Sequence, residues 1–240
     1  MKTEVIYYLL SHTLLFKFTQ NNDCMIESIL LLGFLRIPYH FCSMEMISAL
    51  EKIAIVSGII SVWFSKKGNI WVYPIGMLST IIYIYLSFHG DLFGEATVNL
   101  YYTIMSVYGW YNWMRHDNEK GLLIRISNSS TAAWRKEILF FMGMYIILFF
   151  ALQYIKEAFA PGAIPWADAL ASASAFTGMW LMAKKKVNSW IWWIITNIVS
   201  VPLYYVKGFN ETSFYYLILL VLAILGLVEW RKKANEIEQH

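Results

Sequence analysis

Charged residues are scarce in this sequence, and their scarcity excludes most kinds of soluble protein. Only 15% of the 240 residues are Asp, Glu, Lys or Arg, whereas apolar residues make up 58%. A typical soluble domain is about 25% charged and about 45–50% apolar. The net charge of +3 is also too small to indicate a nucleic-acid partner. The composition therefore predicts a protein of the lipid bilayer.

Cysteine and histidine are also sparse. The two cysteines, Cys24 and Cys42, lie near the N-terminus, so the rest of the chain can form neither a disulfide nor a thiolate metal site. The five histidines have no partner at a spacing useful for catalysis, and the sequence contains no G-x-x-x-x-G-K-[ST] phosphate loop. We therefore expect neither an enzyme nor an ATP-driven pump, and no metal or cofactor.

Long apolar segments are abundant. A helix that crosses roughly 30 Å of hydrocarbon needs about 17–25 mostly apolar residues. Seven segments meet or approach this length, and we expect each to form a transmembrane helix. They are Ile47–Phe64, Ile70–Phe88, Thr97–Met114, Ile138–Ile155, Ala169–Ala183, Val187–Val206 and Thr212–Val228.

The loops between these segments differ in charge. The loops after the first, third, fifth and seventh segments hold most of the basic residues, and such loops face the cytoplasm. We therefore expect a cytoplasmic C-terminus. The basic residues are Lys66, Lys67, Arg115, Lys120, Arg125, Arg135, Lys136, Lys184, Lys185, Lys186, Arg231, Lys232 and Lys233.

Residues 1–45 do not fit this pattern. Val5–Phe16 is apolar but short, and no small-residue cleavage site follows it. One interpretation is an additional N-terminal helix or an interfacial segment. The alternative is that translation starts at Met44 or Met46, just before the first clear segment.

Side chains of the second and third segments recur in the sixth and seventh. At an offset of 121 positions, Trp71, Ser79 and Tyr83 match Trp192, Ser200 and Tyr204. At an offset of 117, Gly109 and Trp113 match Gly226 and Trp230. The change of offset predicts a four-residue deletion in a loop of the second copy. The alternative is a chance alignment of aromatic-rich helices.

Three helices per copy is an odd number, so one further span must restore the orientation of the second copy. We expect an all-α integral membrane protein with seven transmembrane helices in a 3+1+3 arrangement of parallel repeats, or with one extra N-terminal helix. Transporters enclose a midplane site between such repeats. The expected units are an extension (1–45), a first repeat (46–134), a linker helix (135–160), a second repeat (161–233) and a cytoplasmic tail (234–240).

Six strings of residues occur in order along the chain. They are Asn-Ile-Trp-Val-Tyr-Pro-Ile-Gly at 69–76, Tyr-Gly-Trp-Tyr-Asn-Trp at 108–113, Pro-Trp-Ala-Asp-Ala at 165–169, Trp-Ile-Trp-Trp-Ile-Ile-Thr-Asn at 190–197, Leu-Tyr-Tyr-Val-Lys-Gly at 203–208 and Gly-Leu-Val-Glu-Trp at 226–230. These strings resemble the PnuC family of vitamin transporters, whose architecture is similar to that of the SWEET sugar transporters. The resemblance covers about residues 46–233.

The resemblance implies uptake of nicotinamide riboside by facilitated diffusion, with thiamine or another nucleoside-like vitamin as the alternative substrate. It also implies a homotrimer in the bacterial inner membrane and a cytoplasmic kinase that traps the substrate by phosphorylation. Three positions depart from the family pattern: Glu95 replaces Asp, Asn99 replaces Gln, and Asn197 replaces an Asp found in many relatives. From another class, a membrane receptor or binding protein without transport remains the alternative.

One helix face of the sixth segment suits a flat aromatic cation. Trp190, Trp193, Asn197 and Tyr204 share this face, where an indole attracts a cationic ring and an amide reads polar groups. Asn99 is expected across the pathway. For Trp190, Trp71 and Tyr73 the alternative is the aromatic belt at the membrane surface. The predicted substrate-binding residues are Trp190, Trp193, Asn197, Asn99, Tyr204, Trp71, Tyr73 and Glu95.

Overall fold

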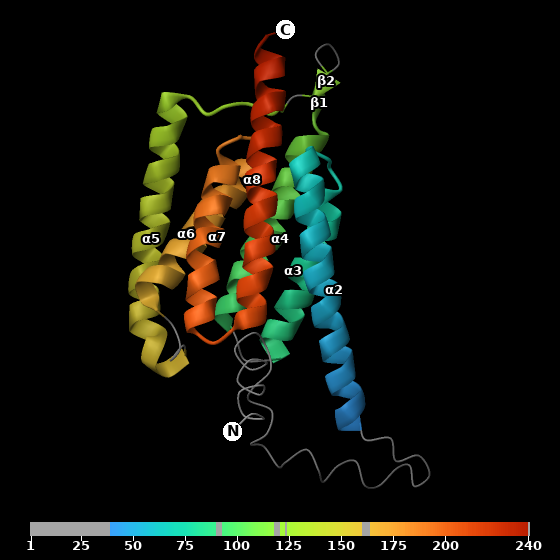
Figure 1. Ribbon diagram of the computed structural model, residues 1–240, viewed down its shortest axis with the longest axis vertical. Helices are drawn as coiled ribbons and strands as arrows, with labels where there is room; N and C mark the ends of the chain where they lie inside the picture. Colours follow the sequence, from blue (N-terminus) through green and yellow to red (C-terminus); the bar gives the residue numbers. More distant parts are fainter. Residues whose placement is uncertain (1–38, 90–92, 118–120, 123, 160–163, 240) are drawn as a thin grey trace.

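The computed structural model describes residues 39–89, 93–117, 121–122, 124–159 and 164–239. This part of the chain forms a bundle of seven helices, with one short pair of antiparallel strands between α4 and α5 (Figure 1). The elements are α2 (Tyr39–Lys67), α3 (Val72–His89), α4 (Phe93–Met114), β1 (His116–Asp117), β2 (Gly121–Leu122), α5 (Thr131–Phe159), α6 (Pro165–Ala183), α7 (Ser189–Val206) and α8 (Asn210–Glu238). Each apolar segment of the sequence coincides with one helix, so the prediction of seven helices is confirmed. Both interpretations of the N-terminus concern residues that lie mostly outside the described ranges.

Five of the described helices, α2, α3, α5, α7 and α8, are long and apolar enough to cross a membrane. Helix α6 is built largely from alanine and other small residues, and most of them are buried against its neighbours. The outer surface of the bundle is apolar, as Leu139 and Phe150 on α5 are 75% and 65% exposed. This arrangement, with small and polar side chains inside the bundle and apolar side chains outside, suits a lipid surrounding.

The helices pack in two sequential triplets. Helix α3 packs against α2 and α4, and α7 packs against α6 and α8. The triplets meet where α2 contacts α8 and where α4 contacts α6, while α5 packs against α6 at the edge of the bundle (Figure 1). In each of these contacts the first helix of one triplet therefore packs against the third helix of the other triplet.

The triplets correspond at a single offset of 117 positions. Helix α3 begins at Val72 and α7 begins at Ser189, 117 positions later. The loops before them also match, because Gly68 and Lys185 both adopt a positive φ, of 70° and 53°. The offset of 121 expected for the second and sixth segments is therefore wrong, and the loop deletion inferred from it is not needed. A shift of four positions is about one helical turn, so aromatic residues that recur along one face gave a false match one turn away.

Corresponding hydrogen bonds support the offset of 117. The Ser79 hydroxyl donates to the carbonyl oxygen of Ala54 at 2.8 Å. The Thr196 hydroxyl lies 3.4 Å from the carbonyl oxygen of Ala171, which occupies the equivalent position in the second triplet. Sequence comparison did not pair Ser79 with Thr196, because the side chains differ although their bonds correspond.

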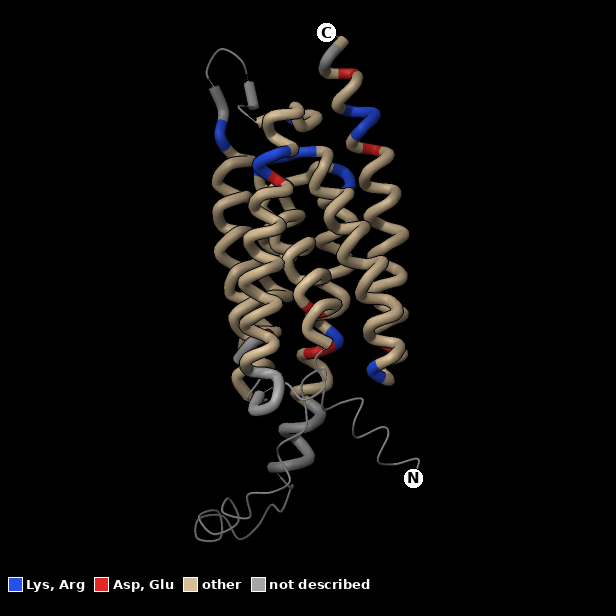
Figure 2. Tube along the Cα trace, turned by 90° about the vertical axis from the view of Figure 1, so that its left-hand side faces the viewer, with Lys and Arg blue, Asp and Glu red and all other residues tan. Residues whose placement is uncertain are grey.

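Basic residues gather at one end of the bundle. Figure 2 shows most of the described Lys and Arg residues at the end that holds the C-terminus. Lys66 and Lys67 lie there in the last turn of α2, and the loop from α6 to α7 adds Lys184, Lys185 and Lys186. This end is called the basic end below.

Candidate functional site

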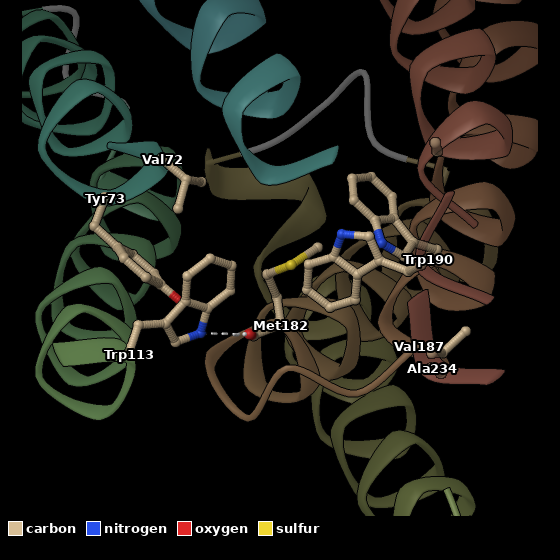
Figure 3. Close-up of a cluster of buried hydrophobic side chains, with 9 residues drawn as sticks. Val72, Tyr73, Trp113, Met182, Val187, Trp190 and Ala234 are labelled. Atoms are coloured by element: carbon tan, nitrogen blue, oxygen red, sulfur yellow. Dashed lines mark hydrogen bonds between the residues drawn. The ribbon is translucent and has the colours of Figure 1, made fainter. Parts of the chain in front are cut away.

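An aromatic cluster at the basic end joins the two triplets, and it contains Tyr73 and Trp190 (Figure 3). Tyr73 meets the ring of Trp113 edge-on, with ring centroids 5.0 Å apart. Trp190 meets Trp230 edge-on at 5.6 Å. These pairs correspond at the offset of 117, and each inner ring packs on a glycine of the adjacent helix, Gly109 for Tyr73 and Gly226 for Trp190.

The cluster is closed by hydrogen bonds between the triplets. The indole N–H of Trp113 donates to the carbonyl oxygen of Met182 at 3.2 Å, as Figure 3 shows. The indole N–H of Trp230 donates to the carbonyl oxygens of Ser65 and Lys66 at 3.1 and 3.0 Å. Lys185 lies over the Trp113 ring, 4.5 Å from its centroid, and burial lowers the pKa of this lysine. The contacts here serve packing between the triplets.

Trp190 is thus placed within a packed core. Only 1% of the residue is exposed, and its indole nitrogen has no hydrogen-bond partner among the described residues. The predicted helix face leads from here along α7, away from the basic end, to Trp193 and Asn197. These two residues lie one and two turns further on.

Trp193 is partly buried and packs across the boundary between the triplets. Its indole lies directly against Gly178 of α6. Its ring centroid also lies 6.3 Å from that of Tyr102 on α4. Trp193 therefore presents an aromatic surface between a helix of its own triplet and a helix of the other.

Asn197 is the clearest polar candidate in the site. The residue is only 3% exposed, and its side-chain oxygen Oδ1 has no hydrogen-bond partner in the described part of the chain. Leaving a buried acceptor unpaired costs about 1–3 kcal/mol. Such a group calls for an explanation, such as a functional role or a bound water or ion.

The repeat explains why Oδ1 of Asn197 has no hydrogen-bond partner in its own triplet. Its counterpart 117 positions earlier is Thr80, whose hydroxyl hydrogen bonds with that of Thr103 at 2.8 Å. The counterpart of Thr103 in the second triplet is Leu220, which has no polar group. The second triplet therefore keeps a buried polar side chain and lacks its partner.

Asn99 and Glu95 lie on α4, in the other triplet. The Asn99 side-chain N–H donates to the backbone carbonyl of Glu95 at 3.0 Å. Glu95 lies in the first turn of α4 and interacts electrostatically with Lys207, which forms an ion pair with Asp168 at 2.7 Å. The carboxylate of Glu95 is therefore near the end of the bundle opposite the basic end.

The two remaining predicted residues differ in their surroundings. Tyr204 stacks on Tyr216 of α8, with centroids 5.1 Å apart and planes 13° from parallel. Trp71 is 58% exposed at the start of α3, where its backbone N–H donates to Asn69 Oδ1 at 3.0 Å. The structure does not bring Trp71 into contact with the other predicted site residues.

Sequence reasoning missed three residues next to the predicted site: Tyr102, Gly178 and Tyr216. Tyr102 touches Trp193, Gly178 supports it, and Tyr216 stacks on Tyr204. The Tyr-Tyr pairs at 101–102 and 215–216 could have signalled the first and third, because each occurs within an apolar segment. Within the described ranges, no three His, Cys, Asp or Glu side chains are placed to hold a metal ion.

A family model described as nicotinamide mononucleotide transporter matches residues 48–232 of the chain. The nicotinamide riboside transporter PnuC of Escherichia coli is 23% identical over 210 residues, covering 79% of this chain and 88% of the relative. The riboflavin/roseoflavin transporter RibM of Streptomyces davaonensis is also 23% identical, over 195 residues, covering 75% of this chain and 83% of the relative. A crystal structure of the vitamin B3 transporter PnuC aligns with a TM-score of 0.62 at 22% identity, covering 82% of this chain and 87% of the other.

Proposed function

This chain belongs to the nicotinamide mononucleotide transporter family, and we propose that it carries nicotinamide riboside across the membrane by facilitated diffusion. The single observation that carries the proposal is the buried, unpartnered Oδ1 of Asn197, one turn beyond Trp193. An indole face and an amide at this spacing match a substrate that joins a flat cationic ring to polar groups. The names of the E. coli and Neisseria mucosa relatives, both nicotinamide riboside transporter PnuC, agree with this substrate.

In the proposed site, the Trp193 indole attracts the nicotinamide ring. A cation over a tryptophan face gains about 2 kcal/mol or more where water is excluded. The Asn197 amide then reads the carboxamide or a ribose hydroxyl, because it can both donate and accept hydrogen bonds. Asn99 faces the ligand from the other triplet, and Glu95 and Tyr204 lie toward the end opposite the basic one.

Trp190, Tyr73 and Trp71 are proposed at the edge of the site. The rings of Trp190 and Tyr73 are covered by Trp230 and Trp113 in this conformation. Contact of these two rings with substrate therefore requires the aromatic cluster to open. Trp71 makes contact only with a substrate that has reached the surface of the bundle, where its ring is exposed.

The proposed architecture is a 3+1+3 arrangement of parallel repeats, with units at residues 46–134 and 161–233 around a linker at 135–160. It is supported by the constant offset of 117 positions and by the reciprocal contacts between the triplets. All seven helices cross the bilayer in this proposal, and the basic end faces the cytoplasm together with the C-terminus. The chain works as a homotrimer in the inner membrane, and a cytoplasmic kinase traps the arriving substrate.

A second candidate substrate is riboflavin. The observation that favours it is the riboflavin/roseoflavin transporter RibM, which is as similar to this chain, at 23% identity, as the E. coli relative. Riboflavin also combines a flat ring with hydroxyl groups, but its ring system is larger and uncharged. Thiamine, a flat cation like nicotinamide riboside, stays as a third candidate on that chemical likeness alone.

Uptake into proteoliposomes tests the proposed function. Labelled nicotinamide riboside should enter until its concentrations inside and outside are equal, without ATP or an ion gradient. Replacing both Trp193 and Asn197 by alanine should abolish this uptake. Tyr154→Ala is the control, because Tyr154 is 90% exposed on α5, a helix that carries none of the proposed site residues. Uptake that is unchanged in the double variant would reject the proposed site.

A further inference from the structure

The two triplets differ at one close contact between their first and second helices. In the first triplet, Gly76 of α3 faces Ser61 of α2, and a Cβ added at Gly76 would lie 2.8 Å from the Ser61 hydroxyl. In the second triplet, the equivalent positions hold Trp193 on α7 and Gly178 on α6. The glycine and the larger residue have therefore changed places between the repeats.

This exchange puts a large ring where the first triplet has none. A Cβ added at Gly178 would lie 3.2 Å from Cε2, 3.2 Å from Nε1 and 3.3 Å from Cδ1 of the Trp193 indole. The indole edge therefore rests on the backbone of α6, with no side chain between them. The nearby residues Ala175 and Thr177 are also small and buried, so only short side chains project from these positions of α6.

The Trp193 ring also lies near Tyr102 of α4, at 6.3 Å between centroids. The indole thus contacts the backbone of α6 and lies close to a ring of the other triplet. A methyl group at position 178 would force the indole to shift by a few tenths of an ångström, because backbone atoms of α6 cannot yield as a side chain does. Binding residues must be held within about 0.5 Å of their productive geometry, so this shift uses a large part of the tolerance.

We infer that Gly178 is a positioning residue that sets the location of the Trp193 ring and thereby the space available to an aromatic ligand. The inference rests on the proposed function, since it requires Trp193 to contact the substrate. Only the second triplet places an aromatic platform at this contact.

The test measures the equilibrium dissociation constant of nicotinamide riboside for the purified full chain in detergent. Gly178→Ala should weaken binding about tenfold, as overpacking of a well-filled contact does. Gly178→Ser, which introduces the residue type that Ser61 has at the equivalent contact, should weaken binding at least as much. If either variant fails to fold, Gly178→Ala in the Trp193→Leu background, where the overpacking is relieved, should fold. Gly143→Ala on α5 is the control, because no atom lies within 4 Å of its added Cβ.

A double-mutant cycle shows whether the effect passes through the indole. Trp193→Leu alone should weaken binding, and adding Gly178→Ala to it should have no further effect, because no indole remains to be displaced. Gly178 variants that bind like the wild type, or that weaken binding equally in the Trp193→Leu background, would overturn the inference alone. Trp193→Leu that binds like the wild type would overturn the proposed site as well.

Discussion

Trp113 and Trp230 lie 117 positions apart and each donates its indole N–H to a backbone carbonyl of the other triplet. Trp113 reaches Met182 at 3.2 Å, and Trp230 reaches Ser65 at 3.1 Å. Met182 and Ser65 are themselves 117 positions apart. The bonds are thus related by the repeat, and they tie the triplets together at the basic end.

Removing either indole N–H should destabilise the folded chain. Trp113→Phe and Trp230→Phe each lose a buried hydrogen bond, which contributes about 0.5–1.5 kcal/mol. The carbonyl oxygens of Met182 and Ser65 keep their backbone donors. Thermal unfolding in detergent measures the effect, with Trp166→Phe as the matched control because Trp166 is 58% exposed. Midpoints for the two cluster variants that equal the control would contradict the role of these bonds.

Asn197 provides a prediction in which stability and function change in opposite directions. Asn197→Leu replaces a buried amide, whose Oδ1 has no partner, with an apolar group of similar size, so it should stabilise the ligand-free chain by about 1–3 kcal/mol. The same change should lower the affinity for nicotinamide riboside. Unfolding without ligand and titration with ligand measure the two effects.

Asn188→Leu is the matched control for this substitution. The Asn188 side-chain N–H donates to Glu137 Oε2 at 3.1 Å, and both residues are buried. Leucine at position 188 should therefore destabilise the chain. Equal losses of stability in the two leucine variants would contradict the conclusion that Oδ1 of Asn197 has no hydrogen-bond partner.

Lys185 should make the free energy of unfolding depend on pH in the alkaline range. Burial lowers its pKa below the ordinary lysine value of 10.5, so the unfolded chain binds this proton more tightly than the folded chain does. The free energy of unfolding should then rise as pH increases toward 10.5, through the interval between the folded and unfolded pKa values. Lys185→Met should remove this part of the slope, as judged from unfolding midpoints in alkaline buffers. Lys232→Met, at an exposed ion pair of α8, should keep it.

The ion pair at the opposite end gives a further test. Lys207 and Asp168 lie 2.7 Å apart with side chains 15% and 19% exposed, and Asp168 also accepts the backbone N–H of Ile164 at 2.6 Å. Asp168→Asn should cost about 1–3 kcal/mol, because Lys207 loses its partner in a partly desolvated place. Asp168→Asn combined with Lys207→Met should cost less than the sum of the single changes. Strict additivity in thermal unfolding would show that the pair does not interact.

Hydropathy alone predicted the seven helices, because apolar length is what a membrane helix requires. The start of α6 was placed too late, at Ala169 instead of Pro165. A proline at the first helical position and the bond from Ile164 to Asp168 begin this helix, and neither is an apolar signal. The short strand pair β1 and β2 also lacks a hydropathy signal.

Side-chain surroundings were less predictable than helices. The spacing of Trp190, Trp193 and Asn197 gives one helix face, but spacing does not say what covers that face. The structure shows that Trp230 covers Trp190, whereas the acceptor of Asn197 has no partner. The support under Trp193 could not be predicted either, since a glycine such as Gly178 has no side chain that marks a contact.

The most direct measurement is calorimetric titration of the purified chain with nicotinamide riboside, and with riboflavin and thiamine in separate runs. Each ligand is titrated into the wild type and into the variant with alanine at both Trp193 and Asn197. We expect saturable binding of nicotinamide riboside to the wild type and its loss in the variant. Absence of binding to the wild type, or binding that survives in the variant, would contradict the proposed substrate or the proposed site.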